Sequence, residues 1–211
     1  MMNQNNQTKY FKNRKNLRLK NYDYSSNGAY FVTICVNNRE CLFGNIIDGQ
    51  MCLNDAGLMV DEIYRDLENK FANIQCGKYV IMPNHFHCVI HICNDIKSNV
   101  GVNLCVDPKL EKGEHAGTPL HKIIQWFKTM TTNAYINGVK TKNWQPFDKR
   151  LWQRNYYEHI IRNENSYNEI IKYIQLNPLK WELDELNPKF ENKNAIKKTV
   201  ELISQIVRYI L

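Results

Sequence analysis

The fold is decided by one apolar stretch in the middle of the chain, residues 79–92, which reads YVIMPNHFHCVIHI. Its β-branched and aromatic residues predict a long strand region, and Pro83 predicts a break within it. Side chains at i and i+2 leave a strand on the same face, so His85 and His87 should stand side by side while Phe86 anchors the strand in the core. Two imidazoles at this spacing can chelate a divalent cation, although two polar residues on a solvated face would show the same pattern.

The neighbouring segments predict further strands. Residues 30–36, YFVTICV, form a β-branched and aromatic run that is typical of a buried strand. The pair Asp48-Gly49 is a hairpin turn signal between two short strands, at 41–47 and 51–53. One more strand is expected over residues 151–161.

Helical spacing of apolar residues predicts the remaining elements. Asn54 or Asp55 should cap the first helix, Thr118-Pro119 should open the second, and Ser166 with Glu169 forms a capping box for the third. The helices are expected over residues 54–71, 118–136 and 166–178, with a last one from about residue 196. Their buried positions should include Leu58, Met59, Ile63 and Leu67 in the first, and Ile123, Ile124, Phe127 and Met130 in the second.

These elements together predict an α+β fold. Hairpins and long excursions separate the strands, without regular βαβ spacing, which indicates a mainly antiparallel sheet with helices packed on it. The chain has 211 residues, 43% of them hydrophobic, which is enough for one globular core. No apolar run approaches the ~20 residues of a bilayer helix, and the polar, basic N-terminus lacks the apolar segment of a signal peptide. Neither a membrane segment nor secretion is therefore expected.

Charge and cysteine content indicate what kind of partner the protein binds and in which cellular compartment it works. The net charge of +7 favours an anionic partner, most commonly nucleic acid, although a merely basic surface is the alternative. The seven cysteines form no CxxC pair, which argues against a zinc ribbon. Reduced thiols in the cytoplasm fit this pattern best.

The helix expected before Pro178 carries two polar side chains beside its apolar stripe. Tyr167, Ile170, Ile171 and Ile174 form the stripe by i, i+3, i+4, i+7 spacing. Tyr173 and Asn177 are i and i+4 neighbours at its edge, where a side chain is aimed past the core. Two plainer interpretations remain open, a half-exposed helix tyrosine and a C-terminal cap. Because Asn177 precedes a proline, it should also mark the helix end.

Four segments resemble, in this order, the REP-associated tyrosine transposases. They begin with Tyr22-Asp23-Tyr24-Ser25 and Gly28 to Thr33, and continue with MPNHFH at 82–87, WQRNYYEH at 152–159 and YIQLNP at 173–178. These transposases are relatives of the single-tyrosine insertion-sequence transposases of the HUH superfamily. The resemblance covers about residues 14–181. It implies a ferredoxin-like antiparallel sheet that carries the two histidines. Composition separately predicts a basic N-terminal arm (1–20), and apolar spacing predicts a C-terminal helical extension (186–211). The catalytic domain would span residues 21–185.

The resemblance also implies a reaction and a site. Tyr173 matches the nucleophile, and His85, His87 and Asn177 match the ligands of a divalent metal, Mg²⁺ or Mn²⁺. The activity would be cleavage and rejoining of hairpin-associated single-stranded DNA through a 5′-phosphotyrosine intermediate, by a cytoplasmic, nucleoid-associated monomer or homodimer. Insertion-sequence relatives often carry Gln as the third ligand, so Asn177 departs from their pattern.

Cations that could contact DNA gather in two places. The arm is either disordered or a phosphate-contacting element, and the loop 137–150 with the strand after it interleaves cations with Trp144 and Trp152. The charges can hold the DNA backbone while the rings stack on unpaired bases, or the tryptophans can simply fill the core. The candidate DNA-binding residues are Arg14, Arg18, Lys140, Lys142, Lys149, Arg150 and Arg154.

Two other functions compete with this interpretation. A domesticated copy could bind DNA hairpins without cutting them, although the complete set of candidate catalytic residues argues against decay. A nucleotide hydrolase of the histidine-triad type would need HxHxH, whereas Val89 occupies the third position here.

Overall fold

The computed structural model describes residues 22–94 and 117–190, which fold around one antiparallel sheet. Its strands are β1 (Gly28–Cys35), β4 (Ile74–Met82), β5 (His85–Ile92) and β6 (Tyr157–Ile161). They lie in the order β4-β5-β1-β6, so β5 and β1 are central and every neighbouring pair is antiparallel. The predicted α+β class is therefore confirmed.

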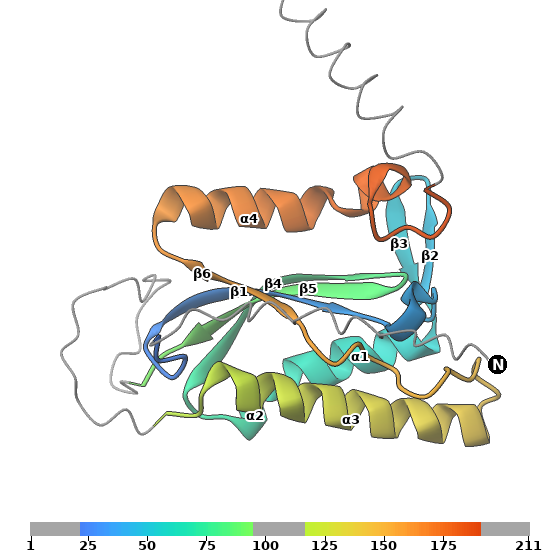
Figure 1. Ribbon diagram of the computed structural model, residues 1–211, viewed down its shortest axis with the longest axis horizontal. Helices are drawn as coiled ribbons and strands as arrows, with labels where there is room; N and C mark the ends of the chain where they lie inside the picture. Colours follow the sequence, from blue (N-terminus) through green and yellow to red (C-terminus); the bar gives the residue numbers. More distant parts are fainter. Residues whose placement is uncertain (1–21, 95–116, 191–211) are drawn as a thin grey trace, which may run out of the picture.

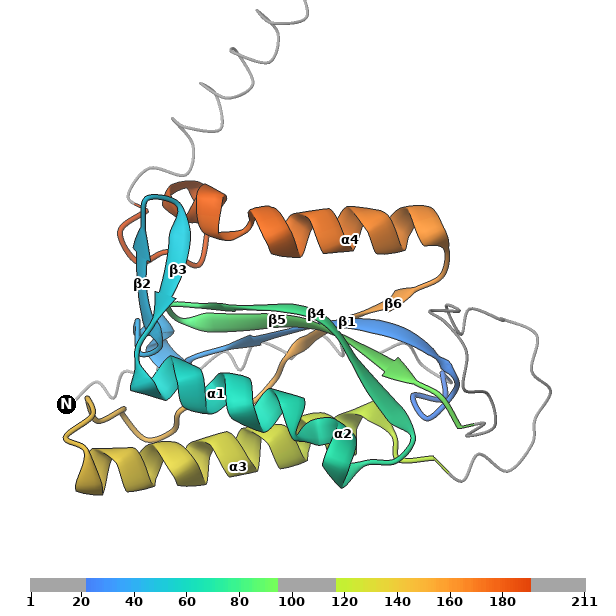
Figure 2. The same cartoon turned by 180° about the vertical axis from the view of Figure 1, so that it is seen from behind.

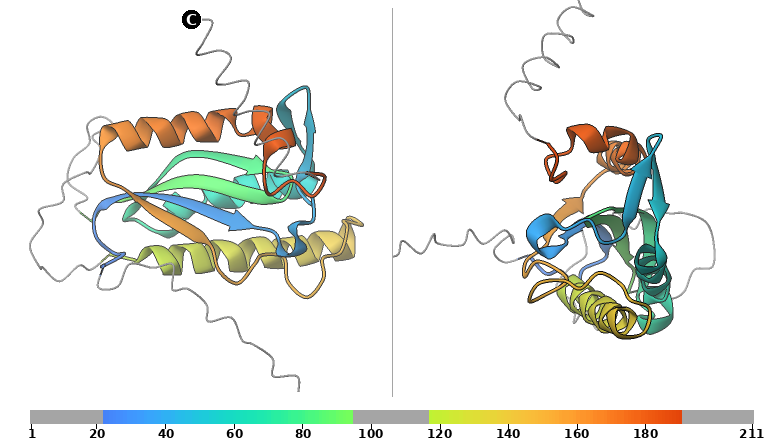
Figure 3. Two further views of the ribbon diagram at one scale, coloured as in Figure 1. Left: turned by 45° about the horizontal axis from the view of Figure 1, so that its top comes forward. Right: turned by 90° about the vertical axis from the view of Figure 1, so that its right-hand side faces the viewer.

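Helices cover both faces of this sheet. On one face lie α1 (Asp55–Arg65), α2 (Leu67–Lys70) and α3 (Leu120–Thr141), and on the other lies α4 (Glu164–Leu176) (Figure 1). The end-on view in Figure 3 shows the same three layers. Tyr64 and Phe127 pack on Phe86 on the α1 and α3 side, as expected for the residue between the two histidines. On the α4 side a smaller cluster contains Phe31, Val89 and Ile174.

A separate hairpin of β2 (Gly44–Ile47) and β3 (Gln50–Leu53) stands at one end of the sheet (Figure 2). Its turn residues Asp48 and Gly49 have φ of 50° and 72°, the left-handed conformation that this tight turn requires. Two short 3₁₀ helices complete the chain, η1 (Asn37–Arg39) after β1 and η2 (Pro178–Leu183) after α4.

The stretch 79–92 differs from its prediction as a single strand region. β4 and β5 are two strands that turn back at Pro83 and Asn84 and pair with each other, with Met82 opposite His85. Every residue of β5 is buried, because β5 has a strand on each side and helices on both faces. A strand covered on both faces loses the alternation of polar and apolar residues, so periodicity alone did not reveal the turn.

Several predicted positions and boundaries were wrong, and local contacts explain them. Asn54 does cap α1, but Leu58 is exposed, and the helix buries Ala56, Gly57, Val60 and Tyr64 instead. Met130 of α3 is likewise exposed, and α3 continues to Thr141.

Two further boundaries moved in the C-terminal half. The cap of α4 is Asn163, whose side chain accepts from the N–H of Ser166, so the predicted cap lies inside the helix. β6 begins only at Tyr157, and before it Trp152 pairs with Val36 in an isolated bridge.

The described residues contain no helix long and apolar enough to cross a bilayer. The predicted N-terminal arm, with Arg14 and Arg18, and the predicted last helix lie outside the described residues.

Candidate functional site

Two histidines of β5 form the centre of the site. The ring centroids of His85 and His87 are 4.6 Å apart, and the His87 ring lies 5.2 Å from that of Tyr173 on α4. Both imidazoles therefore leave the sheet on the α4 face, as their spacing predicts. Their side chains are almost fully buried.

Asn84 determines which nitrogen of His85 carries the proton. Its amide nitrogen donates to the carbonyl oxygens of Arg39 and Leu186, at 3.0 and 2.7 Å. Its Oδ1 lies 2.9 Å from Nδ1 of His85 and can only accept. Neutral His85 is therefore protonated on Nδ1, and its Nε2 carries a free lone pair.

His87 is held by three neighbours on β1 and α4. Its Nδ1 lies 2.7 Å from the hydroxyl oxygen of Thr33, which is its partner across the sheet. Its Nε2 lies 3.3 Å from the phenol oxygen of Tyr173. The ring of Phe31 stacks on His87, with centroids 5.4 Å apart and planes 24° apart. The imidazole is thus fixed in orientation, with Nε2 facing the tyrosine.

Helix α4 brings Tyr173 and Asn177 to these histidines. Ile174 is buried under the helix, so the adjacent Tyr173 sits at the edge of the apolar stripe, half-exposed but with its hydroxyl at His87. Asn177 keeps helical dihedral angles (φ −58°, ψ −45°) although it precedes Pro178. Its buried amide therefore stays one turn beyond Tyr173, where it acts on the pKa of both Tyr173 and His85.

The donor atoms of the site fit a divalent cation. Two buried acceptors have no hydrogen-bond partner among the described residues, Nε2 of His85 and Oδ1 of Asn177. Burial lowers the pKa of His85 to about 3 and holds the pKa of His87 well below its usual value, so both imidazoles are neutral and can donate lone pairs. Buried lone pairs without a partner are costly, and a cation would satisfy them. Within residues 22–94 and 117–190, no three His, Cys, Asp or Glu side chains already lie in a metal-binding arrangement, so with the side chains where they stand the amide oxygen of Asn177 would be the third donor.

The phenol of Tyr173 is protonated in this environment. Burial raises its pKa above the ordinary value of a tyrosine, and the negative charge of Asp184 adds to this effect. The nearby Asn177 amide opposes it. Tyr173 therefore needs additional positive charge at the site before it can act as a nucleophile.

Asn84 should also contribute strongly to stability. Replacing Asn84 with Ala removes three hydrogen bonds and leaves two carbonyl oxygens and an imidazole nitrogen unpaired, which should lower the free energy of unfolding by about 2–4 kcal/mol. Urea denaturation measures this change. Asn69→Ala is the control, because the amide of Asn69 bonds only to exposed Asp66, and we expect a loss of about 0.5 kcal/mol or less. Equal losses in the two variants would contradict the role assigned to Asn84.

The candidate DNA-binding cations divide between two positions on the α3 side of the sheet. Lys149, Arg150 and Arg154 line a cleft between α3 and the segment before β6. Lys142 lies over the ring of Trp144, and Lys140 is exposed near the end of α3. The structure therefore brings three of these cations together, but not beside the histidines, which are on the α4 side.

The two tryptophans in this region differ in how deeply they are buried. Trp152 is buried against Phe43 and Phe127, and its Nε1 donates to Thr131. Trp144 packs on Tyr135 at the end of α3. The core interpretation therefore holds for Trp152, whereas Trp144 is only partly buried.

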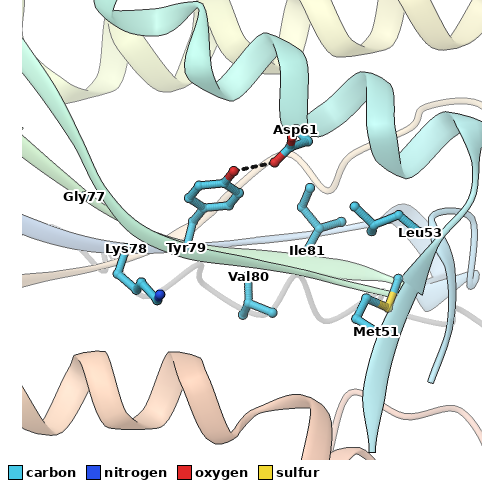
Figure 4. Close-up of a pocket in the computed structure, with 8 residues that line it drawn as sticks. All are labelled: Met51, Leu53, Asp61, Gly77, Lys78, Tyr79, Val80 and Ile81. Atoms are coloured by element: carbon cyan, nitrogen blue, oxygen red, sulfur yellow. Dashed lines mark hydrogen bonds between the residues drawn. The ribbon is translucent and has the colours of Figure 1, made fainter. Parts of the chain in front are cut away.

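A second hollow lies along the edge strand β4 and is not part of the histidine site. Figure 4 shows Tyr79 and Ile81 pointing toward α1, and Lys78 and Val80 pointing toward α4. The carboxylate of Asp61 in this hollow already accepts from Tyr79 and pairs with Arg65. The carboxylate of this hollow is therefore already paired.

The comparisons with known proteins agree with this architecture. No family model matches the chain. A solved structure of a REP-associated tyrosine transposase bound to a REP hairpin is similar, with a TM-score of 0.50 and 19% identity, over 77% of this chain and 73% of that one. A suspected transposase of Deinococcus radiodurans R1 aligns with a TM-score of 0.41 and 13% identity, over 75% of this chain and 95% of that one. The similarity to the first of these structures shows that the chain has a transposase-like fold.

Sequence similarity places the chain in a family. A protein of Haemophilus influenzae (strain Rd), described as uncharacterized, is 43% identical over 175 residues. The match covers 82% of this chain and 92% of the relative. The chain belongs to the family of this protein.

Proposed function

We propose that this protein is a single-tyrosine DNA transposase, which cleaves and rejoins single-stranded DNA beside a hairpin. The observation that carries the proposal is the phenol oxygen of Tyr173, 3.3 Å from Nε2 of His87 and next to the unpaired acceptors of His85 and Asn177. The proposed nucleophile and the proposed cation ligands thus lie together between β5 and α4. The similar fold of a transposase bound to a REP hairpin supports a hairpin substrate.

The reaction that suits this site is a transesterification. The phenol oxygen of Tyr173 forms a bond to phosphorus, and the bond from phosphorus to the 3′ oxygen breaks. The phenol releases a proton and the 3′ oxygen takes one up, so the products are a 5′-phosphotyrosine and a free 3′-hydroxyl. The protein–DNA link keeps the energy of the phosphodiester, so the reverse attack can rejoin the strands without ATP.

Mg²⁺ or Mn²⁺ is the proposed cofactor, with His85, His87 and Asn177 as the residues that would hold it. Such a cation, when bound, polarises a phosphate oxygen and supplies positive charge beside the phenol. Imidazole ligands suit Mn²⁺ at least as well as Mg²⁺. The protein orients the donors in advance: Asn84 fixes His85, while Thr33 and Phe31 fix His87.

The test is formation of a covalent protein–DNA adduct. The full-length protein is incubated with hairpin oligonucleotides that carry randomised single-stranded flanks and a 3′ label, with Mn²⁺ or Mg²⁺ and with EDTA. We expect a labelled protein band on a denaturing gel only when metal is present. Hairpin binding without any such band in either metal would identify a binding protein that does not cut DNA.

Hairpin binding should depend on the cation cleft beside α3. Replacing Lys149, Arg150 and Arg154 together with Gln should lower the slope of log affinity against log salt by about 2–3, because each phosphate contact releases about one counterion. Fluorescence anisotropy over a salt series measures the slope. The control is the pair Lys70→Gln and Lys122→Gln, two exposed lysines outside this cleft. A slope that is unchanged in the triple variant would exclude the cleft as a DNA contact.

A further inference from the structure

The turn that follows η2 is fastened beside the two histidines. The ring of Trp181 lies 6.1 Å from that of His85. The carbonyl oxygen of Leu186 accepts from Asn84, and that of Glu185 accepts from Arg39 at 2.8 Å. These contacts hold the turn in place beside His85. A side chain carried by this turn is therefore positioned relative to His85.

Asp184 is the residue of this turn that faces the site. One carboxylate oxygen, Oδ1, accepts from the backbone N–H of Leu186 at 2.7 Å. The other, Oδ2, lies 3.8 Å from Nε2 of His85, and the Asp184 side chain is only 13% exposed. Since the Nδ1 of His85 bonds to Asn84, this carboxylate oxygen lies near the very nitrogen whose lone pair is unpaired.

We propose that Asp184 is an additional, anionic ligand of the cation that His85, His87 and Asn177 would hold; this inference rests on the proposed function. Two donors with bonds of about 2.1 Å to one octahedral ion are ~3.0 Å apart when adjacent and ~4.2 Å apart when opposite. The observed separation of 3.8 Å lies within that range. If Oδ2 moves by about 1 Å toward Nε2 of His85, the two atoms reach the separation of adjacent ligands. Oδ1 can stay bonded to the N–H of Leu186 during this movement.

The charge of the donor set gives an independent reason for this ligand. Both imidazoles are neutral, and so is the amide of Asn177, so these three donors place no negative charge on a doubly charged ion. Mg²⁺ and Mn²⁺ are bound in proteins chiefly through carboxylates. Among the described residues, Asp184 supplies the carboxylate that lies within 4 Å of a histidine of the pair.

Metal titration in the absence of DNA tests this inference. Mn²⁺ binding to the metal-stripped, full-length protein is followed by electron paramagnetic resonance of the free ion. Asp184→Asn keeps the side-chain oxygen that accepts from Leu186 and removes the charge, so we expect Mn²⁺ affinity to fall about 10- to 100-fold with the melting temperature unchanged. Asp184→Ala, which removes both oxygens, should lower it at least as far.

Glu185→Gln is the matched control, because it makes the same change of charge on the next, exposed side chain. We expect its Mn²⁺ affinity to equal that of the unmodified protein. An Asp184→Asn affinity equal to that of Glu185→Gln would overturn the inference and leave Asp184 as the residue that closes the turn. An unmodified protein that binds no Mn²⁺ would overturn it as well.

The same titration separates this inference from the proposed function. Binding of Mn²⁺ that requires Asp184, in a protein that forms no DNA adduct, would support the ligand and refute the transposase activity. Adduct formation with Mn²⁺ affinity independent of Asp184 would support the activity and refute the ligand.

Discussion

Replacing Tyr173 with Phe should abolish the covalent protein–DNA adduct, by a factor on the order of 10³ or more, while hairpin binding persists. The substitution removes the one oxygen that lies at Nε2 of His87 and leaves the aromatic ring. That ring contacts Phe31 edge-on at 6.0 Å, so the packing under α4 should be conserved. The adduct is measured on a denaturing gel and hairpin binding by anisotropy.

The control for this variant is Tyr157→Phe. Tyr157 lies on β6 and is half-exposed like Tyr173. We expect Tyr157→Phe to form the adduct at the rate of the unmodified protein. If Tyr173→Phe forms the adduct and Tyr157→Phe does not, the nucleophile is Tyr157 and the geometry of the histidine site has been misinterpreted.

The parts of the site that sequence could predict are those set by local periodicity. The i, i+2 spacing places His85 and His87 on one face, and the helical stripe places Tyr173 and Asn177 at its edge. Each of these relations spans at most four residues along one element. The resemblance to a known family then related the two elements, and the structure brings Tyr173 to His87 across 86 positions of the chain.

The groups that support the histidines could not be predicted, because their contacts join distant segments. Asn84 bonds to Arg39 and to Leu186, which are 45 and 102 positions away. Its place next to His85 in the motif was the available signal, but adjacency did not indicate a hydrogen bond. No sequence pattern indicated that Asp184 lies beside His85, because nothing in its local sequence relates it to a strand about a hundred residues earlier.

The same reasoning explains the errors in the fold. The break in residues 79–92 was predicted at Pro83, yet the reversal of the chain there was not. A hairpin turn of Pro83-Asn84 carries no glycine, and Asn84 is kept in the turn by its tertiary hydrogen bonds. Leu58 and Met130 were assigned to the core from spacing alone, whereas the surface that each helix buries is set by its neighbours.

Replacing His87 with Ala should abolish adduct formation as completely as Tyr173→Phe, but for a different reason. The single lone pair of His87 Nε2 faces the phenol of Tyr173 in the structure and would be given to the proposed cation when it binds, so the loss of His87 should lower Mn²⁺ affinity by on the order of 100-fold. Tyr173→Phe should leave that affinity unchanged, because the phenol is not among the proposed ligands. Mn²⁺ titration without DNA therefore distinguishes the two variants, and hairpin binding should persist in both.

Two further variants test whether a loss of folding alone explains the result for His87→Ala. The ring of His87 stacks on Phe31, so Ala leaves a cavity, whereas His87→Gln fills much of the space with a poorer ligand. We expect His87→Gln to melt near the temperature of the unmodified protein and still to lose Mn²⁺. His159→Ala removes an exposed imidazole from β6 and should retain full affinity. A His87→Gln protein that is folded, binds Mn²⁺ normally and forms the adduct would exclude His87 from both the metal site and the reaction.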